Sequence, residues 1–436
     1  MKKLSYFAAF FAAMTMFSCS NNDDPTVDPT GQGDRVVKFK ITSEGTKAEH
    51  PGVPSGAQTE IKDGVIYFCN SSGNAVYSYT LSTADISSLA GPTVQTISVP
   101  NVPASASQIV MGANAIQAGI TYPTYAGQSI TTLSAFTFDI KNQQPFGGAS
   151  TTKPVDKIVM SGSGVIEADN TNPTAPIYSA TINLTPSLSR LEVKTVRSKG
   201  TGNVIGEIQM FRLLGVFVPN HSASGTVTGV GSTSLVKPIN TSTQNYYAAS
   251  FPMASGIGGY LSDYNIKGLS KDSLKFWAYH TFPAKNEGIG DDRLPHIVVA
   301  VDSIYFKNSS GQTEIYRNGA VQYITVTKYF VGKYNDTPAP STQLTEFKKG
   351  YVHRIDGKEP PHGYMYLDDS GNPKVVENLN QVPAGKTPIV VTLPGGEGGI
   401  TFGLDDLTDQ PYDAHKTINC LITVMPWTII NITPDL

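Results

Sequence analysis

Alternating apolar and polar residues recur along most of the chain, in short runs separated by turn residues. In the earliest run Val37, Phe39 and Ile41 point to one side, and lysines occupy the positions between them. A period of two is what a half-buried β-strand requires. Further runs, rich in β-branched and aromatic residues, predict strands at 65–69, 75–81, 93–99, 134–140 and 177–184.

The same pattern continues in the second half of the chain, where it predicts strands at 188–197, 206–220, 273–282, 296–306, 321–331, 350–356 and 389–393. The stretch 83–91 could form a helical turn or two. Many short strands between turn signals indicate a β-sandwich or barrel, so we predict an all-β protein. The 436 residues suffice for about two domains, and Pro186 interrupts an extended path. We therefore expect one domain over 35–185 and another over 186–436.

The start of the chain has the pattern of an export signal. Two lysines precede an apolar run that ends just before Cys19, and this run is shorter than the ~20 residues of a membrane span. The cysteine stands where a lipoprotein signal peptidase would leave it. We predict a signal peptide over 1–18, a lipid on Cys19 and a flexible linker over 19–34; an ordinary signal peptide that discards Cys19 is the alternative. The polar, acidic stretch 20–24 resembles the export signal of Bacteroidetes surface lipoproteins and favours a cell-surface location.

Composition supports an extracellular β protein. Charged residues make up 15% of the chain, against ~25% in an average soluble protein. The net charge is -3 without any Lys/Arg run, so nothing indicates a nucleic-acid partner. Cys69 and Cys420 both lie in strand-like runs. Two separately buried thiols are the favoured interpretation, and a disulfide is the alternative.

No motif indicates catalysis or a bound metal. The seven histidines lack zinc-binding spacing. Asp291-Asp292 and Asp405-Asp406 are adjacent pairs without the alternating pattern of a calcium loop, and we interpret them as solvated carboxylates. The glycine-rich stretch 395–399 is interpreted as a turn and not as a phosphate loop. We predict a protein that is not an enzyme and needs no cofactor.

The sequence of the C-terminal tail predicts two short strands separated at Pro426. Alternation runs from 418 to 424, the proline interrupts it, and a second apolar stretch follows over 427–436. A hydrophobic strand with no partner after it is an aggregation hazard on a monomer, and adding it to the sheet of another subunit would remove the hazard. From the residues alone, the tail either does this or closes the sandwich of its own domain.

Six features in order resemble the fimbrillin family of Bacteroidales, whose members are subunits of protease-assembled type V pili. They are the lipoprotein cysteine, an early strand followed by "TKA" (46–48), "SLSRLEVKTVR", "FWAYHTFPAKN", "GYVHRID" and the final "LITVMPWTIINITPDL". The resemblance covers nearly the whole chain. It implies two tandem transthyretin-like Greek-key β-sandwich domains, and a precursor that becomes part of an extracellular fimbria serving adhesion and biofilm formation.

The resemblance also implies a mechanism. A protease would cut the loop 43–58 at Lys47-Ala48, and the first strand, 36–42, would leave with Val37, Phe39 and Ile41. A neighbouring subunit would then donate a strand from its tail, 417–436. The donor residues implied by the resemblance are Trp427, Ile429, Ile430, Ile432 and Leu436.

One departure from the family concerns the cut. Its best-known members present Arg, whereas this chain has Lys47, and Arg35 lies before the strand. Implied partners are other pilus subunits, the outer membrane through the lipid on Cys19, a maturation protease and a host or bacterial surface ligand. The alternatives are an anchor or tip subunit of the same pilus, or a surface glycan-binding lipoprotein. Two Asp-Ser-aliphatic triplets add a glycosylation hypothesis at Ser273 or Ser303.

Overall fold

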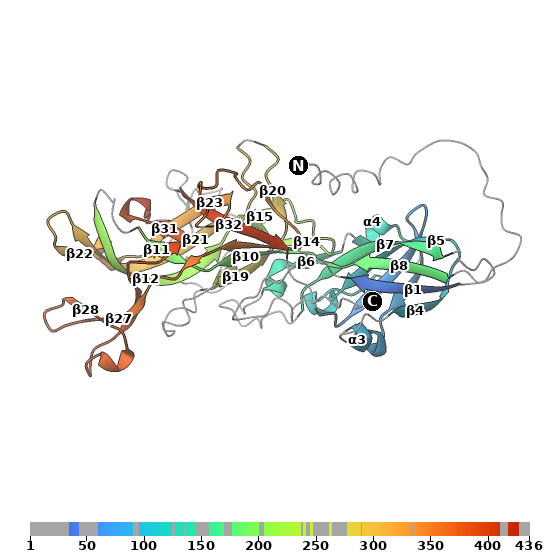
Figure 1. Cartoon of the computed structure of the whole chain (residues 1–436), viewed down its shortest axis with the longest axis horizontal. Coiled ribbons are helices and arrows are strands. Elements are labelled where there is room, and N and C mark those ends of the chain that lie inside the picture. Colours follow the sequence, from blue (N-terminus) through green and yellow to red (C-terminus); the bar gives the residue numbers. More distant parts are fainter. Residues whose placement is uncertain are drawn as a thin grey trace, which may run out of the picture.

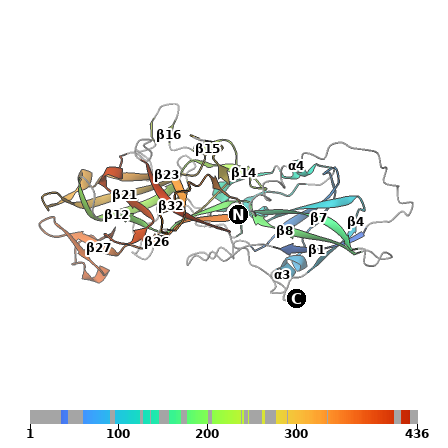
Figure 2. The same cartoon turned by 45° about the horizontal axis from the view of Figure 1, so that its top comes forward.

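The structure is a computed structural model (Figures 1 and 2). It describes residues 35–42, 60–89, 96–123, 127–134, 136–144, 157–169, 177–199, 205–236, 239–240, 245–246, 261–263, 277–288, 290–333, 335–409 and 417–426. The described part consists mostly of β-strands with a few short helices, which confirms the predicted all-β class. Two large sheets follow one another along the longest axis of the molecule (Figure 1).

The first sheet is built from the N-terminal half of the chain. Its strands lie in the order β3-β2-β5-β7-β8-β1-β4, and β9 pairs with β7. The bounds are β1 Arg35–Thr42, β2 Gly64–Asn70, β3 Ala75–Thr80, β4 Ile97–Val102, β5 Ala106–Ala113, β7 Met160–Asp169, β8 Ile177–Asn183 and β9 Thr185–Pro186. Strands β2, β3 and β4 were expected from their apolar content, whereas β5 was not predicted. The predicted helix is present as α3, Thr83–Leu89.

Strand β7 forms a corner in this sheet. Its first part pairs with β5, whereas its last four residues pair with β8. A Cβ atom on Gly164 would lie 2.3 Å from the carbonyl oxygen of Thr181, and one on Gly162 would lie 2.4 Å from that of Asn183. Only glycine permits so close an approach of another backbone, so these two glycines let β8 fold back over β7. The strands on either side of the corner contribute to one hydrophobic cluster.

The second sheet is built from the C-terminal half. Its order is β19-β10-β25-β32-β23-β21-β12-β29-β27-β28, with β18 on β12 and β22 on β21. The bounds are β10 Ser189–Val193, β12 Gly206–Val218, β18 Leu261–Asp263, β19 Trp277–Thr281, β21 Ile297–Asn308, β22 Thr313–Ile315, β23 Gln322–Val331, β25 Tyr351–Ile355, β27 His362–Leu367, β28 Pro373–Val376, β29 Ile389–Thr392 and β32 Thr417–Pro426.

Short elements complete the described chain. They are β6 Thr137–Asp139, β11 Val196–Ser198, β13 His221–Ser222, β14 Ser224–Thr226, β15 Leu235–Val236, β16 Ile239–Asn240, β17 Asn245–Tyr246, β20 Ala284–Lys285, β24 Glu346–Phe347, β26 Gly357–Lys358, β30 Glu397–Gly398 and β31 Ile400–Phe402, with helices α4 Ile130–Ser134, η2 Ile116–Ala118, η3 Ile140–Gln143, η6 Tyr316–Gly319, η7 Leu379–Gln381 and η8 Leu404–Asp406.

A packed seam joins the two halves. Strand β6 of the first half pairs with β14 of the second, and the rings of Phe138 and Phe282 lie 5.0 Å apart. The side-chain amide of Gln144 donates a 2.9 Å hydrogen bond to the carbonyl oxygen of His280. One cluster of buried hydrophobic residues extends through both halves. The domain boundary near residue 185 stays a prediction.

Candidate functional site

Strand β1 fills an interior position of the first sheet, between β8 and β4. It runs parallel to β8, with Val37 level with Tyr178, and antiparallel to β4, with Val37 level with Val99. In Figure 1 it is the blue arrow between β8 and β4. We call this position the slot. The resemblance predicted a first strand that plugs a sheet, and β1 has the placement which that prediction requires.

The register of β1 explains its alternating sequence. Val37 is completely buried, whereas its neighbour Val36 is 51% exposed. Position 39 is level with the buried Ile97 and Ala180, and position 41 is level with the buried Ile182. The odd positions of β1 therefore lie on the row that faces the core. The side chains of Phe39 and Ile41 themselves lie outside the described part of the structure.

The two walls of the slot differ. Strand β8 also pairs with β7 on its far side, whereas among the described residues β4 has no strand partner other than β1. Each backbone hydrogen bond contributes about 0.5–1.5 kcal/mol net, and burial of Val37 about 1.5–3 kcal/mol. Removing β1 would leave the pairing groups of both walls without partners and the core row uncovered.

Arg35 belongs to the strand and not to a free segment before it. The residue pairs with Val102 of β4, its side chain donates to the carbonyl oxygen of Ala106, and its guanidinium lies 4.2 Å from the ring centroid of Tyr178. Proteolytic nicking concentrates in exposed loops. A cut after Arg35 would fall inside a paired ladder, and β1 would remain joined to the rest of the chain.

The C-terminal tail is divided at Pro426. Residues 417–426 form β32, which lies inside the second sheet, parallel to β23 and antiparallel to β25. Cys420 and Ile422 of this strand are buried in the chain's own core. The first part of the tail therefore completes its own sheet, and the last pair of the ladder joins Tyr351 to Pro426.

Several predicted site residues lie outside the described residues. They are the lipidation site Cys19, the cleavage pair Lys47 and Ala48, the donor residues Trp427, Ile429, Ile430, Ile432 and Leu436, and the hypothetical glycosylation site Ser273. Ser303 is described: it lies in β21 with a φ of 47°, next to Asp302, which binds Arg212 in a salt bridge.

A buried ionic network that sequence reasoning missed lies beside the seam. Glu192 has no exposed surface, and its two carboxylate oxygens accept from Arg190 at 2.7 Å and from Arg354 at 2.5 Å. Burial lowers the pKa of Arg190, and the Glu192 carboxylate opposes that shift. His280 is completely buried, close to Arg190, and both burial and that positive charge hold its pKa well below 6.5. This network fixes the contact between β10, β19 and β25.

Both cysteines of the described chain are free and buried. The interpretation as separate thiols is confirmed, and the alternative of a disulfide is wrong. Burial raises the pKa of Cys69 to about 11 and that of Cys420 to about 12. Neither thiol forms a reactive thiolate at neutral pH.

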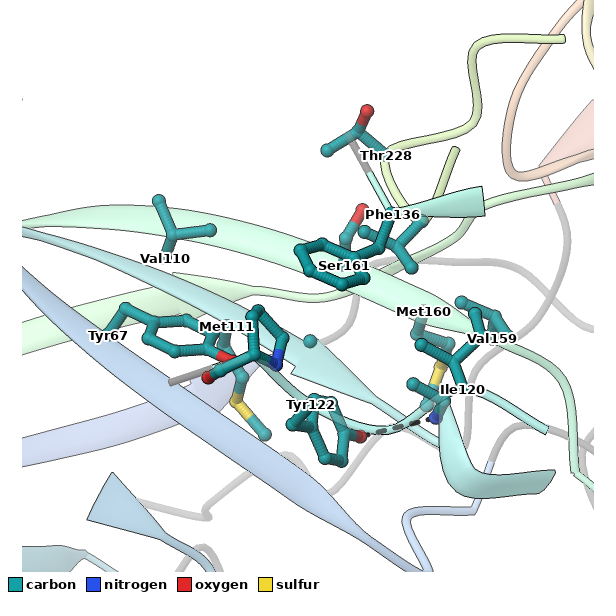
Figure 3. Close-up of a pocket in the computed structure, with 14 residues that line it drawn as sticks. Tyr67, Val110, Met111, Ile120, Tyr122, Phe136, Val159, Met160, Ser161 and Thr228 are labelled. Atoms are coloured by element: carbon teal, nitrogen blue, oxygen red, sulfur yellow. Dashed lines mark hydrogen bonds between the residues drawn. The ribbon is translucent and has the colours of Figure 1, made fainter. Parts of the chain in front are cut away.

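A small apolar cavity lies next to the seam (Figure 3). Its volume is about 30 Å³, enough to hold a water molecule. Tyr67, Met111 and Tyr122 line it from the first half, and Thr228 from the second. The hydroxyl of Tyr122 accepts a 3.2 Å hydrogen bond from the amide of Ala115.

Other chemistry is not indicated in the part of the chain that the structure describes. It contains no group of three or more His, Cys, Asp or Glu residues that could hold a metal ion. Asp291 contacts Arg293 at 3.3 Å, and Asp292 contacts His296 at 2.6 Å. Within the described ranges, no helix has the length and apolar character needed to cross a membrane.

Fold and slot define the class of this protein as an all-β chain whose first strand fills an interior position of a sheet. No family model and no curated protein matches the sequence. Among solved structures it is similar to a fimbrilin from Porphyromonas gingivalis W83, with 10% identity, a TM-score of 0.47, and 92% of this chain and 99% of that chain covered.

Two further neighbours are a fimbrial assembly protein from Parabacteroides distasonis ATCC 8503 (12% identity, TM-score 0.34, 82% and 98% covered) and the fimbrial anchor protein Mfa2 from Porphyromonas gingivalis (10%, 0.30, 79% and 95%). All three come from Bacteroidales and are fimbrial proteins. With TM-scores below 0.5, the function has to be proposed from this chain's own residues and geometry.

Proposed function

We propose that this chain is a structural subunit of a fimbria, polymerised by exchange of strand β1 for the tail of a second copy. The observation that carries the proposal is the position of β1. It is paired on both sides, yet it is joined in sequence to the rest of its half only through residues 43–63, because β2 begins at Gly64. One cut in that segment would separate a strand from its sheet.

The precursor would be a lipoprotein held at the outer membrane through Cys19. Cleavage at Lys47-Ala48 would release the lipid together with β1, and the slot would open at the same step. A cut after Arg35 would release the lipid and leave the slot filled, because β1 would remain attached to the body. Lys47 is therefore the processing site that we favour over Arg35.

The donor would come from 427–436. This stretch follows directly after β32, which stays in the second sheet, and ten residues span at most about 33–36 Å. Burying three or four apolar side chains in the slot would contribute roughly 1.5–3 kcal/mol each before ordering costs. Adhesion and biofilm formation would follow from the polymer, as expected for a fimbria, and no enzymatic role is needed.

Cleavage of the purified precursor with a Lys-specific protease tests the processing step. We expect a new N-terminus at Ala48, loss of 35–42 from the body and a ladder of oligomers on a denaturing gel. Lys47→Ala should remove the cut and the ladder. Lys62→Ala is the matched control, because Lys62 is an exposed lysine between the loop and β2, and it should leave both unchanged. Oligomers that still contain an intact 35–56 segment would refute the mechanism.

Variants of the tail test the donor. Ile430→Asp and Ile432→Asp should abolish the ladder without changing cleavage, because each would place a charge on the apolar row of the donor strand. Asn431→Asp, on the opposite face of the same segment, should leave the ladder intact. A chain that caps preformed polymers and never extends them would instead be a tip or anchor subunit.

A further inference from the structure

The two walls of the slot differ in the strand partners that they keep when β1 is absent. β8 keeps the ladder to β7 when β1 is absent. β4 pairs through Ile97, Ser98, Val99 and Val102, all of them with β1. Within the described residues it has no second strand beside it.

The outer edge of β4 cannot readily find another partner. Pro100 lies in the middle of the strand, lacks an N–H group, and is exposed together with Asn101. Asn101 has a φ of 58°, in the left-handed region, so regular pairing is interrupted at this point. Both features are typical of edges that do not accept a further strand.

β1 also ties down the corner that follows β4. The turn after Val102 leads into β5, and the amide of Ala106 donates a 3.0 Å hydrogen bond to the carbonyl oxygen of Pro103. The carbonyl oxygen of the same Ala106 accepts from the side chain of Arg35. Departure of β1 therefore removes the ladder of β4 and one contact at its end in a single step.

We propose that β4 is a conditional strand, which is ordered only while the slot is filled. Three aliphatic side chains, those of Ile97, Val99 and Val102, hold it to the core, but its ladder depends on the occupant. The opened subunit thus presents one rigid wall, β8, and one wall that forms around the incoming strand. Recognition of that strand is coupled to folding of β4. For the same buried area, this coupling lowers the affinity of the acceptor for the incoming strand.

The coupling deepens the proposed function and rests on it only for the identity of the incoming strand. Strand β4 is the second recognition surface of the acceptor, and a donor that repeats the pairing of β1 runs antiparallel to β4 and parallel to β8. A segment that satisfies β8 alone would leave β4 without its ladder.

Hydrogen exchange on the uncut chain tests the coupling without any polymerisation. Val37→Ala weakens the docking of β1 from inside, and Val36→Ala makes the same change at an exposed position of the same strand. In Val37→Ala, the amides of β1 and β4 should exchange at least about tenfold faster, by a common factor. The amides of β5 and β10 should keep wild-type rates, and Val36→Ala should leave all four strands unchanged.

Acceleration of β1 alone would overturn the proposal, and so would equal acceleration of β5, which would mean that the whole half opens. If Val37→Ala changes no strand, Val37→Asp places a charge in the core and forces β1 out. β4 amides that remain protected in that variant would also overturn the proposal. Cleavage and the oligomer ladder of the wild type are measured separately, so failure of the fimbrial function is distinguishable from failure of the coupling.

Discussion

Neutralising Glu192 tests how strongly the buried ionic network contributes to stability. The Glu192→Gln variant keeps the shape of the side chain and removes the charge that Arg190 and Arg354 share. Arg190 is completely buried, so its guanidinium would lose the charge of Glu192 in a low-dielectric surrounding. Breaking a buried pair by removing one partner costs about 3–5 kcal/mol.

The loss can be followed by urea unfolding and by thermal melting. Trp277 is 1% exposed and pairs with Val193 at the end of β10, so its fluorescence reports on this part of the sheet. For a unit of 150–250 residues, 1 kcal/mol shifts Tm by about 2–4 °C, which gives a decrease of about 6–20 °C for Glu192→Gln.

Two further variants make the result decisive. Replacing all three together, Arg190→Met and Glu192→Leu with Arg354→Leu, should recover most of the stability, because an apolar cluster needs no counter-charge. Lys194→Met is the control: Lys194 contacts Asp356 at 3.0 Å on the surface, with its side chain 47% exposed, and its loss should cost less than about 1 kcal/mol. A loss below about 1 kcal/mol for Glu192→Gln would refute the reasoning.

Three other outcomes are expected. Burial lowers the pKa of His353 to about 3 and holds that of His280 well below 6.5. The unfolded chain therefore binds more protons below pH 6.5, and the free energy of unfolding should fall there by up to about 1.4 kcal/mol per pH unit for each histidine; a flat urea-unfolding profile from pH 6.5 to 5 would contradict this. Gly164→Ala should abolish folding of the first half, measured by circular dichroism, and a native-like spectrum and melting curve would show that the β7 corner can relax. Cys69 and Cys420 should react with a thiol reagent only in denaturant, and fast labelling of native protein would disprove their burial.

Local patterns were sufficient to predict elements with a clear apolar signal. The alternation in β1, the apolar run of β2 and the short helix α3 all lie where the sequence places them. Strand β7 was missed because residues 161–164 near its start, "SGSG", are small and carry no apolar pattern. Their glycines are required by the backbone of β8, which is distant in sequence, and no local rule contains that information.

The charged network of β10 was missed for a related reason. Alternation in "SRLEV" places positions 189, 191 and 193 on the core face and predicts that Arg190 and Glu192 are exposed, but all five residues are buried. The side chain of His280, held by the carbonyl oxygen of Gln143, lies next to Arg190. The seam therefore covers the face that an isolated sheet would leave in water. Which strands flank β1 could not be predicted either, since β8 follows it by more than a hundred residues.

The direction of β1 has a mechanical consequence. The strand and its two neighbours run along the longest axis of the molecule (Figure 1), and its ladder extends along both flanks. A load applied along this axis to a strand in the slot pulls parallel to the ladders. It must break the bonds of both flanks together, in shear, and cannot open them one after another like a zipper. A fibre joined through this position would resist tension along its length much better than peeling from the side.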